Sequence, residues 1–264
     1  MENKRLFFGF EVVSPWPEAL PSGRAILESD RHLTVAFLGD SNLPEVIDRL
    51  ATFPPLPFQI GLCGIFDRPI FLPHRSPNVA AWNIRWLENE ELFLRFQKDL
   101  VGWLQENGLH PREQAGKFLS HVTIARKPFV IHEWKKDFET RPLFIRNLHL
   151  CESLGSSRYK VCWSYPILAP FEEKEHTADI AFTVRGTSFQ DLSLHAQLAL
   201  SFYFSPLTDY FSFEEVRSLD EIVQLLNAMI GKVDQEIGSP FKAVSYHGTI
   251  VKTEVMEWEM IVDV

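Results

Sequence analysis

One short pattern occurs twice in this 264-residue chain, and it constrains the fold more than any other feature. Residues 32–36 and 121–125 each read His, apolar, Thr, apolar, Ala. On a strand, residues two apart point to the same face, so each copy presents an imidazole beside a hydroxyl. With nine histidines, roughly half of one His-x-Thr is expected by chance. A single copy therefore carries no information, whereas two copies that share five positions do.

The elements around the two copies follow a common order. β-branched and aromatic runs predict strands, and apolar residues at helical spacing predict helices. Before residue 170, strands are expected at 5–13, 32–38, 58–62, 79–84, 121–126, 143–152 and 159–165, and helices at 43–53 and 88–108. The order predicts a duplicated α+β architecture in which an approximate two-fold axis relates two lobes. If the lobes face each other, each repeat supplies half of one site.

Two imidazoles and two hydroxyls around one pocket suit a phosphodiester. His32 and His121 can accept and donate protons, while Thr34 and Thr123 can hold non-bridging oxygens. This chemistry needs no metal and no other cofactor. Four other histidines have no such partner and are interpreted as surface or loop residues: His74, His110, His132 and His149.

The composition changes near residue 170. Residues 1–170 hold 20 basic and 19 acidic side chains, whereas the rest of the chain holds 6 basic and 16 acidic ones. Two prolines followed by a charged run lie at 166–175, which is typical of a boundary segment. We therefore expect one domain at 1–170 and a second at 171–264. The acidic second domain should repel nucleic acid and suits a cation or a basic protein surface.

Neither a membrane protein nor a disulfide-stabilised one is indicated. No apolar run approaches the roughly 20 residues of a membrane span, and the first residues lack the pattern of a signal peptide. The three cysteines are widely spaced and include no CxxC pair. These features predict a cytoplasmic protein without membrane partners, with free thiols and without a zinc knuckle.

The second domain is expected to be a smaller α+β unit. Strands are predicted at 180–186, 241–245, 249–255 and 258–264, and helices at 188–204 and 219–237. If the final strand pairs beside strand 180–186, Asp179, Asp263 and the α-carboxylate of Val264 cluster, and such a cluster suits a hard divalent cation. A solvated acidic face explains the same residues, and both interpretations stay open at this point.

Residues 1–168 resemble the 2H phosphoesterases, and within them the RNA 2′,3′-cyclic phosphodiesterases formerly called 2′-5′ RNA ligases. The resemblance lies in 5–7 (RLF), 32–39 (HLTVAFLG), Phe118, 121–126 (HVTIAR), 151–154 (CESL) and Tyr159. It implies a duplicated two-lobe fold and the opening of an RNA 2′,3′-cyclic phosphate end to a 2′-phosphate. In that reaction His121 would activate water and His32 would protonate the departing O3′.

The same resemblance assigns the phosphate-binding residues. Thr34, Thr123 and Arg126 would hold the phosphate oxygens, with Arg126 directly after the second motif. Ser120 stands where the family commonly has a proline, a departure that affects entry into the strand more than the chemistry.

Residues 172–264 resemble archease in the segments 175–180 (EHTADI), 241–248 (FKAVSYHG) and 261–264 (IVDV). Archeases are small acidic proteins that activate the RtcB-type RNA ligase. The resemblance implies a pocket for Ca²⁺ or Mg²⁺ at Asp179, Asp263 and Val264. Between about residues 209 and 241 this copy is shorter than the family's pattern, which puts the strength of ligase activation in doubt.

Together the two resemblances imply an α+β fusion protein that acts in RNA repair or tRNA processing. Its partners would be RNA with a 2′,3′-cyclic phosphate end and the RtcB-type ligase. The alternative is a non-catalytic RNA-end-binding or ligase-adaptor protein in which the paired motifs only hold phosphate. Two histidines favour catalysis, because binding alone could use lysine or arginine in place of titratable imidazoles.

Overall fold

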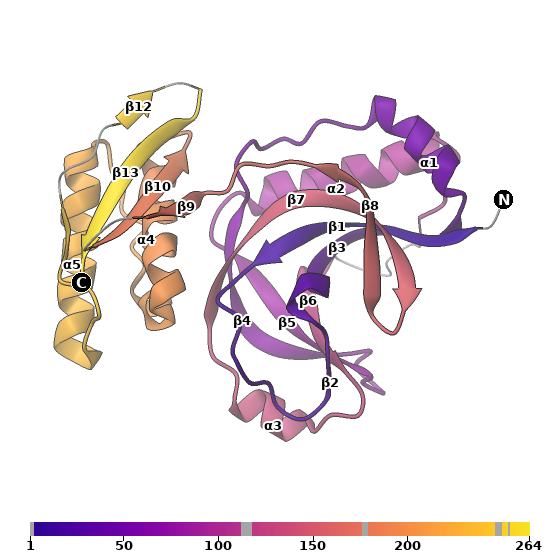
Figure 1. The fold of residues 1–264 in the computed structure, drawn as a ribbon, viewed down its shortest axis with the longest axis horizontal. Coiled ribbons are helices and arrows are strands. Elements are labelled where there is room, and N and C mark those ends of the chain that lie inside the picture. Colours follow the sequence, from indigo (N-terminus) through magenta and orange to yellow (C-terminus); the bar gives the residue numbers. More distant parts are fainter. Residues whose placement is uncertain (1–2, 112–117, 176–178, 246–249, 253) are drawn as a thin grey trace.

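The computed structural model describes residues 3–111, 118–175, 179–245, 250–252 and 254–264. Two antiparallel sheets lie side by side, each with its own helices (Figure 1). The first sheet contains β1 (Lys4–Val13), β2 (Arg24–Ala25), β3 (His32–Ser41), β4 (Cys63–Leu72), β5 (Val79–Trp86), β6 (His121–Arg126), β7 (Arg141–Gly155) and β8 (Arg158–Tyr165). Its helices are α1 (Leu43–Arg49), α2 (Glu90–Glu106), α3 (Ile131–Lys136) and the 3₁₀ turns η1 (Glu28–Asp30) and η2 (Leu50–Thr52).

The strands of the first sheet close into a ring. β1 pairs with β3 and β7, and the circuit continues through β6, β5 and β4 back to β7. At 15 residues β7 is long enough to pair with β1, β4 and β8. The apolar face of α2 packs against the sheet and places Phe93, Phe96 and Leu100 in the core.

The pairing of β3 with β6 bears on the expected duplication. Leu33 pairs with Val122, and the two residues occupy the second position of the repeated motifs. Equivalent residues face each other on antiparallel strands, as a local two-fold axis requires. Both expected lobes contribute their strands to this single ring.

The second sheet is smaller and carries two helices. It contains β9 (Phe171–Lys174), β10 (Ile180–Gly186), β11 (Ala243–Ser245), β12 (Ile250–Lys252) and β13 (Met256–Asp263), with α4 (Phe189–Tyr203), η3 (Ser205–Tyr210) and α5 (Leu219–Ile237). Ser188 begins α4 with a capping box to Asp191. The strand order is β11-β13-β10-β9, and β12 pairs with β13.

An apolar interface joins the two sheets. Phe144 of β7 contacts Phe171 and Phe202, with ring centroids 5.3 Å and 5.5 Å apart. Phe144 and Cys63 are buried within the apolar core of the second sheet, although both belong to strands of the first. The second sheet therefore depends on the first for part of its core.

Most predicted elements are present, and the exceptions have local causes. The strand expected at 58–62 is wrong: Ile60 forms only an isolated bridge to Leu168, and the strand begins at Cys63. The observed strand, β4, was not predicted because its alternation of apolar and polar residues is interrupted. Asp67 lies at a register shift, and Pro69 follows it. Helix α3 and strand β9 were not expected, since they have only six and four residues.

The three cysteines are free thiols, as predicted. None of the described helices combines the length and the apolarity that crossing a lipid bilayer requires.

Candidate active site

The two repeated motifs lie side by side on β3 and β6. Leu33 and Val122 pair with each other and are completely buried in the core. The histidine and threonine that flank each of them project from the opposite face, because side chains alternate along a strand. All four of these side chains, in segments 32–34 and 121–123, are half-buried. The structure thus places the four residues predicted from the motifs on one face of two adjacent strands.

Both imidazoles are held by the same hydrogen bond. His32 Nδ1 lies 2.8 Å from the carbonyl oxygen of Asp30, and His121 Nδ1 lies 2.8 Å from that of Leu119. A carbonyl oxygen can only accept, so Nδ1 carries the proton in each ring. The Nε2 atoms are then the atoms available for proton transfer. Since the contact is made two residues earlier in both repeats, the duplication extends to the orientation of the rings.

The ring of His32 is packed among aromatic side chains. It stacks on Phe7 with centroids 4.7 Å apart and meets the edge of Tyr159 at the same separation. Gly9 lies beside it on β1, where a Cβ atom would approach His32 Cδ2 to 3.2 Å. Glycine at this position therefore leaves room for the imidazole.

Burial keeps both histidines neutral in the free protein. It lowers the pKa of His32 to about 4, and the electrostatic influence of Arg126 and of the neighbouring His121 acts in the same direction, against that of Asp30. Burial also lowers the pKa of His121. The influence of His121 and Arg126 on His32 means that the three side chains share one electrostatic environment.

Arg126 ends β6 and lines a cavity of about 290 Å³. Its Nε–H donates to Ser157 Oγ at 2.8 Å. Arg5 and Arg24 line the same cavity, so three guanidinium groups surround a small space. This arrangement suits an anionic ligand such as a phosphate.

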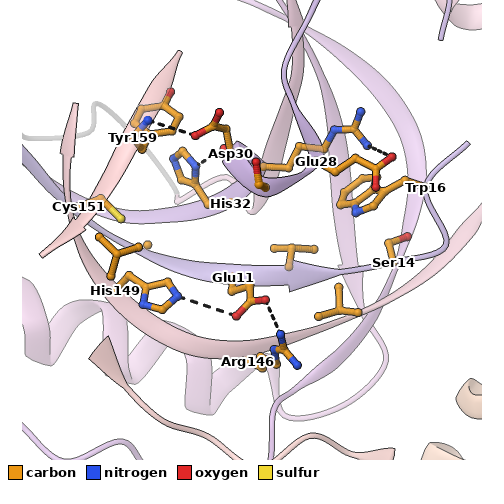
Figure 2. A pocket seen from close by; sticks show the side chains of 16 residues that line it. Glu11, Ser14, Trp16, Glu28, Asp30, His32, Arg146, His149, Cys151 and Tyr159 are labelled. Carbon is orange, nitrogen blue, oxygen red and sulfur yellow. Dashed lines mark hydrogen bonds and ion pairs between the residues drawn. The ribbon is translucent and has the colours of Figure 1, made fainter. Parts of the chain in front are cut away.

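A larger cavity of about 510 Å³ is lined by His32, which does not line the smaller one (Figure 2). Glu11, directly opposite His32 in the β1–β3 register, accepts hydrogen bonds from Arg146 at 2.8 Å and Asn147 at 2.9 Å. Burial alone would raise the pKa of Glu11, but its contacts with His149, Arg146 and Asn147 lower it to about 2. His149 lines the cavity from β7, so it is a half-buried strand residue and not a loop residue.

Tyr159 connects the two cavities, since it lines both. Its backbone N–H donates to Asp30 Oδ1 at 3.1 Å, and the carbonyl oxygen of Asp30 also accepts the hydrogen bond of His32. Tyr159 was part of the sequence resemblance, but no role was predicted for it. Glu11 and Arg146 lie far from either motif in the sequence, and no local pattern indicates them.

Ser120, which precedes the second motif, fixes the entry into β6. Its Oγ accepts a hydrogen bond from Trp86 Nε1 at 3.1 Å, and its carbonyl oxygen accepts one from Ile84 N at 2.9 Å. Trp86 thus has a buried partner that a proline side chain would not supply.

The residues predicted to bind metal lie together at one end of the second sheet. Ile180 pairs with Val262, so the next positions outward are Asp179 and Asp263. Lys242 lies at the same end, where its N–H donates to the Asp263 carbonyl at 2.8 Å and its ammonium to Val264 O at 2.6 Å. The potential ligand atoms are oxygens, and the ammonium group of Lys242 beside them would compete with a bound cation. Residues 176–178 and 246–248, which contributed to the archease resemblance, lie outside the described residues.

No family model matches the chain, and no curated protein matches its sequence. Several solved structures are similar to it. A structure described as a phosphoesterase is 18% identical, with a TM-score of 0.46 over 63% of this chain and 99% of its own. LigT of E. coli in its apo form is 17% identical (TM-score 0.44, 64% and 99% covered), and TT0787 of Thermus thermophilus is 16% identical (TM-score 0.43, 62% and 98% covered). Similarity of this degree leaves the activity of the chain to be argued from its own residues.

Proposed function

We propose that this protein is a phosphoesterase that opens RNA 2′,3′-cyclic phosphate ends to 2′-phosphates with His32 and His121 as its proton-transfer pair. The observation that carries the proposal is the pair of equivalent Nδ1 hydrogen bonds, to Asp30 O and Leu119 O. They leave the two Nε2 atoms, on adjacent strands, as matched proton acceptors and donors.

In the proposed reaction, Nε2 of His121 takes a proton from water as the water oxygen bonds to phosphorus. The bond from phosphorus to O3′ breaks, and Nε2 of His32 gives its proton to O3′. Thr34, Thr123 and Arg126 hold the non-bridging oxygens, where donors stabilise the charge that develops in the transition state. The products are a 2′-phosphate and a free 3′-hydroxyl.

The acid role of His32 depends on the substrate's own charge. Its pKa of about 4 leaves the free imidazole unprotonated at neutral pH. A bound phosphate brings negative charge next to the ring and favours the imidazolium form. Substrate binding therefore favours protonation of His32, the acid. His121 remains a base as long as its proton-free Nε2 faces water.

The direct test is turnover of an RNA oligonucleotide that ends in a 2′,3′-cyclic phosphate, with chelator and no added metal. The wild type should release a 2′-phosphate, and His32→Ala should lose that activity. His132→Ala is the matched control, because His132 is exposed on α3, away from both motifs. Binding of the oligonucleotide without turnover by the wild type would favour the non-catalytic RNA-end-binding or ligase-adaptor alternative.

For the second sheet we propose an archease-like module that binds Ca²⁺ or Mg²⁺ and stimulates an RtcB-type RNA ligase. The observation that favours it is the strand register that brings Asp179 and Asp263 to one end of the sheet, beside Val264. The carboxylate oxygens of this set are the donors that hard cations prefer. The bound cation would neutralise them and hold this end of the sheet. Stimulation of ligation in a purified ligase assay, lost in Asp179→Asn, tests this role.

A further inference from the structure

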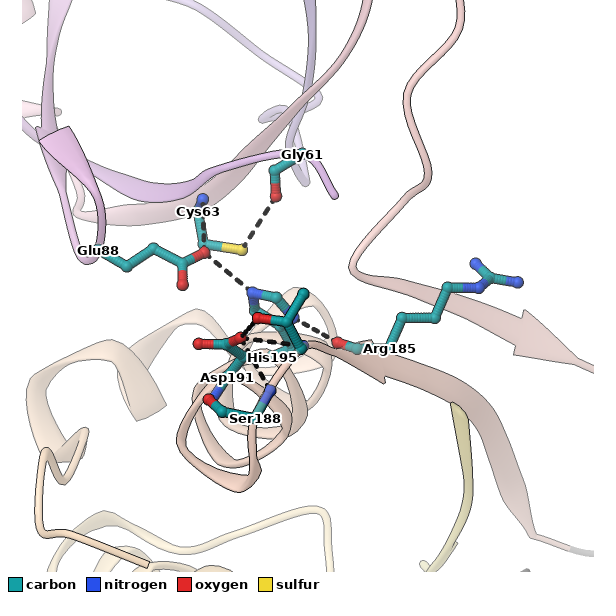
Figure 3. Close-up of polar contacts among 8 residues, drawn as sticks. Gly61, Cys63, Glu88, Arg185, Ser188, Asp191 and His195 are labelled. Atoms are coloured by element: carbon teal, nitrogen blue, oxygen red, sulfur yellow. Dashed lines mark hydrogen bonds and ion pairs between the residues drawn. The ribbon is translucent and has the colours of Figure 1, made fainter. Parts of the chain in front are cut away.

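A second cluster of chemically active side chains lies where the two sheets meet (Figure 3). Cys63 begins β4, Glu88 precedes α2, and His195 lies in α4. Their Sγ, carboxylate and imidazole ligand atoms all lie within 4.8 Å of one another. Cys63 is completely buried and His195 is 2% exposed. The cluster therefore joins both parts of the chain in a site nearly closed to solvent.

The imidazole of His195 is aimed into this cluster. Its Nδ1 lies 2.5 Å from the carbonyl oxygen of Arg185, and its Nε2 lies 2.9 Å from Glu88 Oε1. A backbone carbonyl that holds one ring nitrogen while the other faces a ligand is the arrangement usual for metal-binding histidines. Glu88 Oε1 also accepts the backbone N–H of Cys63 at 3.4 Å, which brings the carboxylate next to the thiol.

The cluster holds protons when no metal is bound. Burial alone would lower the pKa of His195, but the Glu88 carboxylate and the Arg185 carbonyl raise it above its usual value. Burial, together with the charge of Glu88, raises the pKa of the Cys63 thiol. An ion pair between His195 and Glu88 accounts for two of the three residues, while the thiol beside both packs in the apolar core and donates to Gly61 O at 3.8 Å.

We propose that Cys63, Glu88 and His195 form a binding site for a divalent transition metal, with Zn²⁺ as the expected ion. Sulfur, nitrogen and carboxylate oxygen are the three ligand types that zinc accepts, and three protein ligands leave a fourth tetrahedral position open. Glu88 and His195 also line a cavity of about 350 Å³, which provides an entry path and room for a water ligand. This site is independent of the proposed phosphodiesterase and of the Asp179–Asp263 end of the second sheet.

Binding exchanges protons for the metal. As Zn²⁺ enters, Cys63 loses its thiol proton and His195 loses its Nε2 proton, and both protons pass to solvent. Asp191 adds negative charge nearby, since it acts on both Cys63 and His195. Its Oδ2 accepts the backbone N–H groups of Thr187 and Ser188, and Asp191 is not part of the group of ligand atoms, so it supports the cation through its charge.

The test uses Co²⁺ as a spectroscopic substitute for zinc, added to the full chain after removal of metals with a chelator. One equivalent should produce a near-ultraviolet thiolate-to-cobalt band and intense visible bands of tetrahedral cobalt, and Zn²⁺ should abolish both. Cys63→Ser should lose the thiolate band. Cys151→Ser is the matched control, because Cys151 is also a buried thiol but lies on β7 away from the cluster.

A second variant keeps the test decisive if Cys63→Ser fails to fold. Glu88→Gln keeps the size of the side chain and should raise the Kd for Zn²⁺ by about 100-fold or more, since even supporting residues of metal sites contribute 10- to 100-fold. An unchanged Kd in Glu88→Gln, or a thiolate band that persists in Cys63→Ser, would overturn the assignment. So would weak octahedral bands without thiolate character in the wild type, which would indicate binding to carboxylates alone.

Discussion

His32, half-buried in the first sheet, and His195, buried between the sheets, are held in opposite charge states. Both donate Nδ1–H to a backbone carbonyl. Nε2 of His195 also faces a carboxylate, that of Glu88, so both nitrogens donate and the ring is an imidazolium. His32 has aromatic rings and the positive charge of Arg126 around it, and its ring is neutral.

The difference shows that burial alone does not decide the charge of a histidine. Desolvation lowers the pKa at both positions. It prevails at His32, where the Asp30 carbonyl and the Asp30 charge oppose it, and it is outweighed at His195, where the Glu88 carboxylate also hydrogen-bonds to the ring. The neutral pair in the first sheet is ready to receive the charge of a phosphate. The charged pair at the interface already has its counterion, and only a cation with a higher charge would displace its protons.

The largest effect is expected from the proton-transfer pair. His32→Ala and His121→Ala should each lower kcat on a cyclic-phosphate RNA end by about 10²- to 10⁴-fold. The pH profiles should distinguish the roles: the base requires deprotonation, so His121→Ala removes the acidic limb, and His32→Ala removes the basic limb. Identical profiles for both variants would contradict the division into one acid and one base.

A large effect on stability is expected from the charged histidine. Glu88→Ala removes the carboxylate that keeps His195 charged, so the buried ring must carry an unpaired charge or give up its proton, and the free energy of unfolding should fall by about 3–5 kcal/mol. Glu106→Ala, at the exposed C-terminal end of α2, is the matched control and should change little. Denaturant unfolding of the metal-free proteins measures both, and equal stabilities would show that the pair makes no net contribution.

Arg126 should affect substrate binding more than proton transfer. Arg126→Ala removes one of three guanidinium groups around the smaller cavity, so KM should rise by about 10- to 100-fold, as is typical of a lost charge-assisted hydrogen bond. Steady-state kinetics separates KM from kcat. Arg126→Lys keeps the charge and should recover part of the loss, whereas an unchanged kcat/KM in Arg126→Ala would place the arginine outside the substrate site.

The two histidines should also give stability opposite pH dependences. The folded-state pKa of His32 is lowered from 6.5 to about 4, so its contribution to stability is lost as pH falls through that window. The pKa of His195 is raised, so its contribution is present below 6.5 and is lost as pH rises through the folded value. Unfolding measured against pH should show a weaker acid loss in His32→Gln and a weaker alkaline loss in His195→Gln. Parallel curves for the two variants would contradict the assigned charge states.

The sequence predicted one of these sites and missed the other for a physical reason. The His-x-Thr repeats are local, and strand alternation suffices to place both functional side chains on one face. Cys63, Glu88 and His195 are far apart along the chain and have no ligand spacing, so only the contact between the sheets brings them together. Glu11 and His149 could not be predicted for the same reason. The pairing of β1 with β3 and β7 decides which side chains lie near His32.

The smallest effect is expected at the end of the second sheet that is remote from the other two sites. If the α-carboxylate of Val264 is a metal ligand, a short C-terminal extension should weaken Ca²⁺ or Mg²⁺ binding by about tenfold, since affinity for these ions follows the number of charged ligands. Lys242→Met should have the reverse effect, because it removes the ammonium that donates to Val264 O. Calorimetry on the full chain, metal-free at the start, measures the affinity of the wild type, the extended protein and Lys242→Met for the cation. Turnover of cyclic-phosphate RNA is the internal control and should be the same in each. Equal affinities with and without the extension would show that the terminal carboxylate is not a ligand.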